Sequence, residues 1–380
     1  MVVLGAIMRG MEKEMAENAV SNLTGSIQIH HPSYTDDPAI ENSMDRRDDI
    51  DRVLKHRLPP GTGYAHRIKV NAVASNARHS SAVNLLGIDP AAEAKISFIG
   101  KAVTEGRYLE PGDTNAIIVG RALLKTFNTR IGNKLILMSQ DRDNTIASMA
   151  FKITGVFQAD MEATEKQVVF VPITSAAKML KLEGRISETA VRLDDLDLNG
   201  RLESRLGASI SADLGPGYSV KTWRDLIPMM KAYLDMNDYF LYIWYLVVFT
   251  AMGFGVVNTT LMAVYERMRE FGLMKALGMT PAAIVRGVLL ESAVILALGV
   301  VLGNLLGYAT VAVLGHTGID LSALAAGAEM WGIPRILYPE IAVKDVVAAG
   351  VVVMVLGVGV SLYPALKAAR VTPVEAMNMH

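Results

Sequence analysis

Residues 266–278 read ERMREFGLMKALG, and this charged stretch separates two long apolar runs, Tyr239–Val264 and Val288–Leu314. A third apolar run, Val343–Leu362, follows further along the chain. Each run reaches or approaches the roughly 20 apolar residues that a helix needs to cross the hydrocarbon core of a bilayer. The sequence therefore predicts an integral membrane protein, in which the charged stretch forms a short loop on one face of the membrane.

Composition narrows the possible functions. The chain has 380 residues, 51% of them hydrophobic, with a formal net charge of -1 and no cysteine. A near-neutral chain without a basic stripe argues against nucleic-acid binding, and the absence of cysteine excludes disulfides and thiolate metal sites. The histidines lack the spacing of a zinc-binding helix, and the carboxylates follow no catalytic pattern. We therefore expect no catalytic site, no metal and no cofactor bound by this chain.

The N-terminal segment Met1–Met8 is apolar but short. As a helix it extends only about 12 Å, which is too little to cross a bilayer, and Arg9 and Glu12 follow directly. It has neither the basic start nor the small-residue cleavage site of a signal peptide. We expect it to be the outer half of a first span that begins upstream; the alternative is an amphipathic helix lying on the membrane surface.

The region from Thr24 to Ser219 is predicted to form an α+β domain, because short runs rich in Val and Ile alternate with short helical patterns. The predicted strands are Ser26–His30, Arg67–Ala74, Ala82–Gly87, Ala116–Val119, Lys134–Met138, Ala150–Phe157, Gln167–Val171 and Thr189–Leu193. The predicted helices are Arg121–Phe127, Ser175–Leu182 and Asp197–Leu206, after a helix over Glu12–Leu23. The polar stretch Asp36–Asp51 is interpreted as a loop.

The segment Val220–Met236 is amphipathic at helical spacing. Its apolar side carries Trp223, Leu226, Met230 and Tyr233. Pro228 is expected to kink this helix or to begin a new one. From there the chain enters the apolar run at Tyr239 without a further Gly or Pro, which predicts one long helix that leaves the membrane as a stalk.

Loop charges predict the orientation. Arg and Lys are concentrated in Glu266–Lys275 and after the last apolar run, whereas the Gly315–Ile341 loop is poor in them. The positive-inside rule then places Glu266–Pro281 and the C-terminus in the cytoplasm. The large domain and the Gly315–Ile341 loop are expected on the outer side.

The charged stretch has a helical pattern of its own. Phe271, Met274 and Leu277 fall at i, i+3 and i+6, and charges flank this apolar stripe. An amphipathic helix lying along the membrane surface can present such a stripe to the groove of a partner protein. Gly278 is expected to end this helix and Pro281 to begin the next. The alternative is a plain solvated turn between two spans.

Three glycines form a ladder in the second apolar run, Gly299, Gly303 and Gly307. Small residues four apart let helices approach closely in lipid. The ladder is expected to pack within the helical bundle of this chain; a contact with another subunit is the alternative.

Several segments together resemble the ABC-transporter permeases of the FtsX/MacB/lipoprotein-releasing superfamily, also called type VII. Asn258–Arg267 with Arg269–Gly278 is similar to the signature of that family, and Tyr363–Ala376 is similar to its closing motif. Gly25–His30 and Leu86–Pro90 are more similar to the lipoprotein-releasing permeases LolC and LolE.

The resemblance implies a four-span α-helical bundle, here with an incomplete first span, that carries a large extracytoplasmic α+β domain on helical stalks. It also implies a mechanotransmission mechanism, in which a coupling helix rests on a separate ATPase. The chain has no G-x-x-x-x-G-K-[ST] phosphate loop, so the ATP is expected on that partner. The residues assigned to ATPase coupling are Glu266, Arg267, Arg269, Glu270, Phe271, Leu273, Met274, Lys275, Ala276, Leu277 and Gly278.

The implied partners are two ATPase copies, a second permease copy or paralogue, a periplasmic carrier or adaptor, and lipid or lipoprotein cargo at the bacterial inner membrane. MacB-like efflux of peptides or small molecules, and FtsX-like regulation of cell-wall hydrolases, remain alternatives. The predicted segments are 1–23 (partial first span and stalk), 24–219 (periplasmic domain), 220–264 (stalk and second span), 265–281 (coupling helix), 282–314 (third span), 315–341 (periplasmic loop) and 342–380 (fourth span and cytoplasmic tail).

Overall fold

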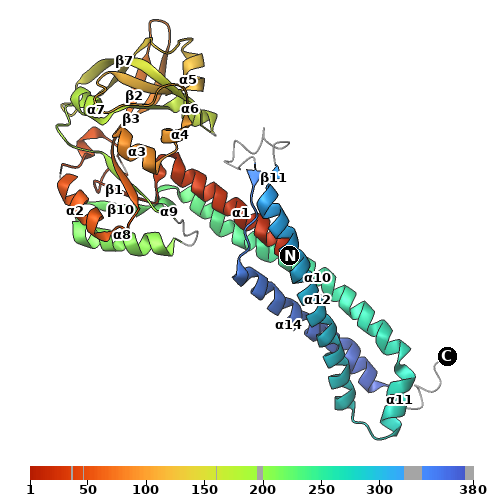
Figure 1. The fold of residues 1–380 in the computed structure, drawn as a ribbon. Coiled ribbons are helices and arrows are strands. Elements are labelled where there is room, and N and C mark those ends of the chain that lie inside the picture. Colours follow the sequence, from red (N-terminus) through yellow and green to blue (C-terminus); the bar gives the residue numbers. More distant parts are fainter. Residues whose placement is uncertain (36, 46, 160, 195–199, 321–335, 373–380) are drawn as a thin grey trace. The chain divides into compact units, whose positions relative to one another are not determined.

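The computed structural model describes residues 1–35, 37–45, 47–159, 161–194, 200–320 and 336–372. The chain forms two compact units. The helical unit contains the described residues of 1–12, 232–320 and 336–372, and the sheet unit contains those of 13–231. Two helices, α1 (Val2–Ala19) and α10 (Pro228–Glu266), contain the points at which the chain passes from one unit to the other (Figure 1).

Three helices of the helical unit are long and apolar enough to cross a membrane: α10, α12 (Pro281–Thr317) and α14 (Val343–Arg370). Glycines bring α12 and α14 together, because a Cβ on Gly357 would lie 2.6 Å from the Leu296 side chain. Large apolar side chains such as Leu302 and Leu305 remain exposed along these helices. A face of this kind is suited to contact with lipid rather than water.

The first helix, α1, confirms the predicted continuation of the N-terminal segment as a helix. It ends in a short π-helical turn, Val20–Thr24, where Leu23 takes a positive φ of 77°. α1 is not among the three helices that are apolar enough to span a membrane. The fourth span of the expected pattern therefore stays a prediction.

The sheet unit contains a ten-stranded mixed sheet in the order β10-β1-β9-β2-β3-β8-β5-β7-β4, with β6 paired to β2 and β7. Its strands are β1 (Ile27–His30), β2 (Gly63–Ser75), β3 (Ser80–Ile88), β4 (Val103–Gly106), β5 (Ala116–Gly120), β6 (Lys134–Gln140), β7 (Ile146–Phe157), β8 (Val168–Pro172), β9 (Glu188–Arg192) and β10 (Ser219–Thr222). In the helical unit, β11 (Ile319–Asp320) pairs with β12 (Ile336–Leu337). All eight predicted strands are present, with boundaries shifted by a few residues.

The pairings of six strands close into a ring, β2-β3-β8-β5-β7-β6-β2. Alternate side chains of these strands point inward and form one apolar core, in which Ile68, Leu85, Leu137 and Phe151 are fully buried. Alternation of this kind is what a sheet with one buried face requires. Helices α5 (Arg121–Thr126) and α7 (Ile173–Leu180) add Leu123 and Leu180 to the same core.

A second apolar core lies at the end of the sheet formed by β10, β1 and β9. Helices α2 (Arg47–Arg57) and α8 (Arg201–Leu214) pack there against β1 and β9, and Arg57 joins them through Asp213 at 2.6 Å. The remaining helices of the sheet unit are a 3-10 turn at Ile40–Asn42, α3 (Pro90–Ile96), α4 (Ile99–Ala102), α6 (Glu162–Gln167) and α9 (Trp223–Leu226). Because β1 pairs with β10, the chain segments that enter and leave this unit lie side by side.

The sheet unit buries a charged network. Arg67 on β2 donates two hydrogen bonds to Glu93 of α3, at 2.9 and 2.7 Å, and one to Glu188 of β9, at 3.0 Å. It also donates to the backbone carbonyl of Leu23, so the network holds the end of the first helical segment. Burial alone would lower the pKa of Arg67, but the two carboxylates outweigh it and hold that pKa above its ordinary value.

Three local predictions need correction. The helix predicted to begin at Val220 is wrong for its first residues, because Val220–Thr222 belong to β10, and α10 begins separately at Pro228. The loop predicted for Asp36–Asp51 is wrong from Arg47, where α2 begins. Of the helix predicted at Asp197–Leu206, residues 197–199 lie outside the described residues, and α8 begins at Arg201.

Candidate functional site

The charged stretch forms a separate short helix, α11 (Met268–Ala276). Arg267 leaves the helical conformation and divides α11 from α10, so the prediction of one helix over Glu266–Gly278 is wrong at its start. At the other end, Met279 N–H donates to the Met274 carbonyl and Gly278 N–H to the Lys275 carbonyl. With Gly278 at a φ of 95°, this is a Schellman motif, as the predicted glycine stop requires.

One face of α11 packs onto its own bundle. Met268 and Phe271 are buried, and they contact Ile284 and Val288 of α12 and Ala365 and Ala368 of α14. Met274 is partly buried against the same cluster. The prediction that Phe271 and Met274 line an outward-facing stripe is therefore wrong, because small alanines on α14 leave room for them inside the bundle.

Two charged side chains, Lys275 and Arg267, connect α11 to the neighbouring helices by hydrogen bonds. Lys275 Nζ donates to the carbonyls of Ala369 and Val371 at the C-terminal end of α14, at 2.9 and 2.7 Å. A lysine at this place satisfies carbonyls that the end of a helix leaves unpaired. Arg267 Nη1 donates to Glu291 of α12 at 2.9 Å. These hydrogen bonds connect α11 and its first flanking residue with both α12 and α14.

The opposite face of α11 is open. Its exposed side chains follow helical spacing and include the last residue of α10: Glu266, Arg269, Glu270, Leu273, Ala276 and Leu277. Leu273 is 63% exposed and Leu277 is 81% exposed. Two large apolar side chains among charges, on a helix held rigidly from behind, form a surface suited to docking in a partner's groove. We call these six residues the α11 strip.

The three glycines of the ladder differ in their surroundings. A Cβ on Gly307 would lie 2.9 Å from Val2 of α1, so this glycine lets two helices of the chain approach closely. Nothing lies within 4 Å of a Cβ on Gly299 or Gly303. These two are free to accept a neighbour from outside the described residues of this chain.

A second feature, absent from the sequence predictions, is a groove of about 220 Å³ between α1 and α10. It is lined by Leu4, Met8, Tyr233, Met236, Asn237, Phe240, Leu241 and Trp244. Aromatic residues gather where a span meets the membrane–water interface, and methionine adapts to irregular apolar ligands. The cluster Tyr239–Tyr245 is the signal that sequence reasoning passed over, because periodicity assigns it to a span without showing what it faces.

The hydrogen-bond partners of Lys275 and Arg267 were also not predictable from the sequence. Glu291 lies 24 residues after Arg267, and the carbonyls of Ala369 and Val371 are backbone atoms that carry no residue-type signal. Within the described residues, no group of three or more His, Asp or Glu side chains is placed to hold a metal ion.

The helices that surround α11 lie in a region that matches a known protein family. The FtsX-like permease C-terminal family matches residues 242–373, which include α11, α12 and α14. The chain is 23% identical over 333 residues to the lipoprotein-releasing system transmembrane protein LolC of Xylella fastidiosa, covering 84% of this chain and 78% of the relative.

Two further relatives extend over nearly the whole chain. The lipoprotein-releasing system transmembrane protein LolE of Haemophilus influenzae is 22% identical, covering 98% of this chain and 89% of the relative. The macrolide export ATP-binding/permease protein MacB of Chlorobium luteolum is 24% identical, covering 96% of this chain and 52% of the relative. The chain carries an FtsX-like permease C-terminal domain over residues 242–373, and over most of its length it is similar to LolC, LolE and MacB.

Proposed function

We propose that this chain is the permease subunit of an ABC transporter that couples ATP hydrolysis by a separate ATPase to movement of the sheet unit, and that it extracts lipoprotein or lipid-like cargo from the bacterial inner membrane. The observation that carries this proposal is the α11 strip. An exposed docking face is held from behind by buried apolar contacts and by Lys275, so that movement of the ATPase is transmitted to the spans. Stiff, packed elements transmit small displacements as rigid-body motion.

The groove between α1 and α10 supports an amphiphilic cargo. Its lining of Phe240, Trp244 and Met236 suits an acyl chain or another apolar group, and Asn237 adds a polar group to it. The relatives LolC and LolE are named for lipoprotein release, and a lipoprotein carries acyl chains of the kind that this groove suits. Released cargo would pass to a periplasmic carrier or adaptor.

The proposed assembly contains two ATPase copies and a second permease copy or paralogue, with ATP bound by the ATPase and no cofactor on this chain. The α11 strip then lies in the cytoplasm and the sheet unit in the periplasm.

A cysteine placed at Thr280 is expected to react with a thiol reagent only from the cytoplasmic side, and one at Gly315 only from outside. The reverse pattern would contradict this orientation.

A second candidate function is efflux of peptides or small molecules, which is favoured by the MacB relative that covers 96% of this chain. An adaptor and an outer-membrane channel in the purified assembly, in place of a lipoprotein carrier, would decide for efflux.

The test of coupling uses the whole transporter reconstituted in lipid. Glu270→Lys and Ala276→Trp change the α11 strip outside its buried apolar cluster. Glu270→Lys also removes the 3.1 Å hydrogen bond that Arg267 Nε donates to Glu270, so Ala276→Trp is the cleaner of the two variants. We expect cargo release per ATP hydrolysed to fall by about tenfold or more, because a misplaced charge or bulk at an interface is costly. Glu41→Lys, an exposed charge reversal in the sheet unit, is the control. Full transport by both strip variants would refute the coupling assignment.

A further inference from the structure

Ionisable side chains meet where α1 lies against α10 and α14. Glu12 of α1 is only 2% exposed. One of its carboxylate oxygens accepts a hydrogen bond from Arg9 Nη1 at 2.9 Å, and the other accepts one from Asn237 Nδ2 of α10. Arg9 Nε in turn donates to Asp345 of α14 at 2.9 Å. Arg9 and Asp345 are partly buried, with 18% and 23% of their side chains exposed. The network therefore surrounds one buried carboxylate, whose burial is costly unless it is paired.

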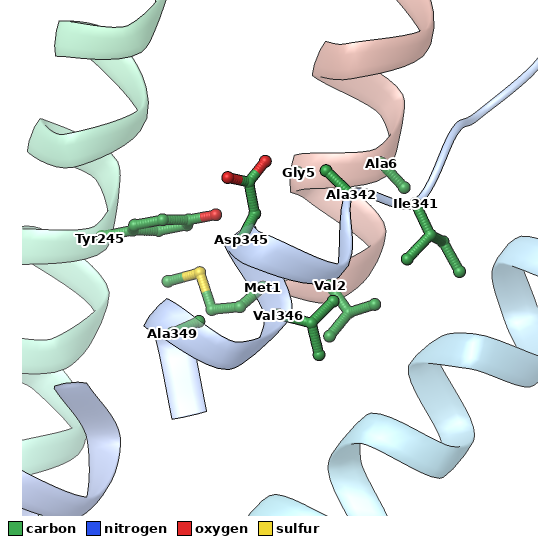
Figure 2. A pocket seen from close by; sticks show the side chains of 10 residues that line it. All are labelled: Met1, Val2, Gly5, Ala6, Tyr245, Ile341, Ala342, Asp345, Val346 and Ala349. Atoms are coloured by element: carbon green, nitrogen blue, oxygen red, sulfur yellow. The ribbon is translucent and has the colours of Figure 1, made fainter. Parts of the chain in front are cut away.

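The α14 side of this cluster is joined to α1 through backbone as well as side chains. Glu340 N–H donates to the Ala6 carbonyl at 3.0 Å. A Cβ on Gly10 would lie 2.3 Å from the Tyr338 carbonyl oxygen, so the glycine permits a direct backbone approach. Figure 2 shows Asp345 beside Gly5 and Ala6 of α1, with Val346 and Val2 below them. This side of the contact is tightly fitted.

The α10 side rests on side chains. Asn237 reaches Glu12, and the Tyr245 hydroxyl lies 3.2 Å from the place of a Cβ on Gly5. Figure 2 shows the Tyr245 ring extending from α10 toward the start of α14 and α1. Asn237 also lines the groove between α1 and α10. The polar contact that joins these helices is therefore part of the wall of the groove.

We propose that Glu12 and Asn237 form a latch that holds α1 and α10 closed beside the groove, while Arg9 and Asp345 orient Glu12 from the α14 side. Opening of the groove requires the Glu12–Asn237 hydrogen bond to break. The α14 contacts of α1 stay in place, so α10 is the helix that separates. The inference rests on the proposed function only for the statement that the groove takes cargo.

The chemistry of the latch allows a reciprocal test. Asn237→Asp removes the amide donor and places a second carboxyl group against Glu12. At a pH that ionises both carboxyl groups, their repulsion opens the contact. Adding Glu12→Gln to that variant restores a hydrogen bond with its direction reversed, because the new amide donates to the new carboxylate. Glu12→Gln alone keeps an acceptor for Asn237 but removes the charge that Arg9 neutralises, so its effect is intermediate. Glu14→Gln, two residues further along α1, is the matched control.

The measurement is a spin-label distance between Leu4→Cys and Phe240→Cys on the full chain in lipid nanodiscs, without ATPase or cargo. The chain has no native cysteine, so labelling is specific. Both positions line the groove from opposite helices. We expect Asn237→Asp to raise the population with a long label distance by about tenfold, as loss of one charge-assisted hydrogen bond implies. The double variant returns to the parent distribution.

An unchanged distribution in Asn237→Asp, or a double variant that stays open, would overturn the latch and leave the cluster as a means of neutralising buried charge. If Asn237→Asp is not inserted, Glu12→Gln decides in its place, and a parent-like distribution there also overturns the proposal. The readout needs neither nucleotide nor cargo. A transporter that fails to release lipoprotein while its latch opens as described would refute the proposed function alone.

Discussion

The sheet unit and the helical unit both bury apolar side chains, but they differ in what they expose. In the sheet unit, apolar residues fill the cores, although the Arg67 network and the carboxylates of Asp141, Glu165 and Glu203 are also buried. In the helical unit, apolar residues such as Leu302 face outward, and charged groups gather between helices at Glu12 and Arg9. The difference reflects the solvent: water drives apolar side chains inward, whereas lipid does not. The same substitution is therefore expected to have different consequences in the two units.

The largest effect is expected from Arg67→Met. The variant leaves Glu93 and Glu188 buried without their cation, which costs about 3–5 kcal/mol of unfolding free energy. Thermal unfolding of the full chain in detergent, followed by the near-ultraviolet signal of the sheet unit, measures it. Arg107→Ala removes a half-exposed ion pair with Asp113 and is expected to cost less than about 1 kcal/mol. Equal losses in the two variants would show that the Arg67 network is not buried as described.

The next largest effect is expected from placing a charge at an exposed apolar residue in each of the two units. Leu302 is 60% exposed on α12, and Ile146 is 83% exposed in the sheet unit. Leu302→Lys is expected to cost about 2.5–3.5 kcal/mol of insertion free energy, because it places a charge in the bilayer core. Ile146→Lys is expected to change stability by about 0.5 kcal/mol or less. Membrane-inserted fractions and melting temperatures measure these effects, and a harmless Leu302→Lys would contradict the lipid-facing assignment.

A smaller effect is expected at the junction of α11 with α14. Lys275→Met removes the donor for the Ala369 and Val371 carbonyls and is expected to weaken the junction by about 1.5 kcal/mol, at the low end for charged hydrogen bonds because Lys275 is half-buried. Hydrogen exchange of the α11 amides is expected to accelerate. Lys344→Met, at an exposed lysine at the other end of α14, is the control. Unchanged exchange would mean that the apolar contacts of Phe271 hold α11 without Lys275.

The mildest effect is expected from pH. Burial lowers the pKa of His30 and of His66 below the ordinary value of 6.5, although Glu188 and Asp51 oppose the shifts. The folded sheet unit then binds fewer protons than the unfolded chain below pH 6.5, so its stability falls as the pH falls through that range. His66→Gln is expected to flatten the pH dependence of the melting temperature between pH 7 and 5. Stability that rises on acidification would contradict the sign.

Sequence reasoning succeeded where one local signal fixes the structure. Uninterrupted apolar length identified α10, α12 and α14, and Gly278 with Pro281 marked the end of α11 and the start of α12. The strands β5 and β8 were recovered because short Val- and Ile-rich runs have few other uses in a soluble domain. The closed ring was not predicted, since it needs the pairings of β6 with β2 and of β8 with β3 and β5, which join segments far apart in the chain.

The failures have the same physical origin. The spacing of Phe271 and Met274 shows that they share a face, but only Ala365 and Ala368 of α14 decide that this face is buried. Helix α2 was missed because its three apolar residues, Ile50, Val53 and Leu54, lie among charges. Likewise, Asn237 reads as an ordinary polar residue before a span, and its partner Glu12 lies 225 residues away.

In the proposed function, an ATPase supplied by another protein acts on α11. The most direct measurement is purification of the chain from its own host in mild detergent, identification of every subunit, and assay of cargo release with and without ATP. We predict that an ATPase subunit copurifies, that release requires ATP, and that Glu270→Lys lowers release per ATP hydrolysed by about tenfold or more without unfolding the chain. Full release of cargo by the purified chain, with no nucleotide-hydrolysing protein present, would contradict the account.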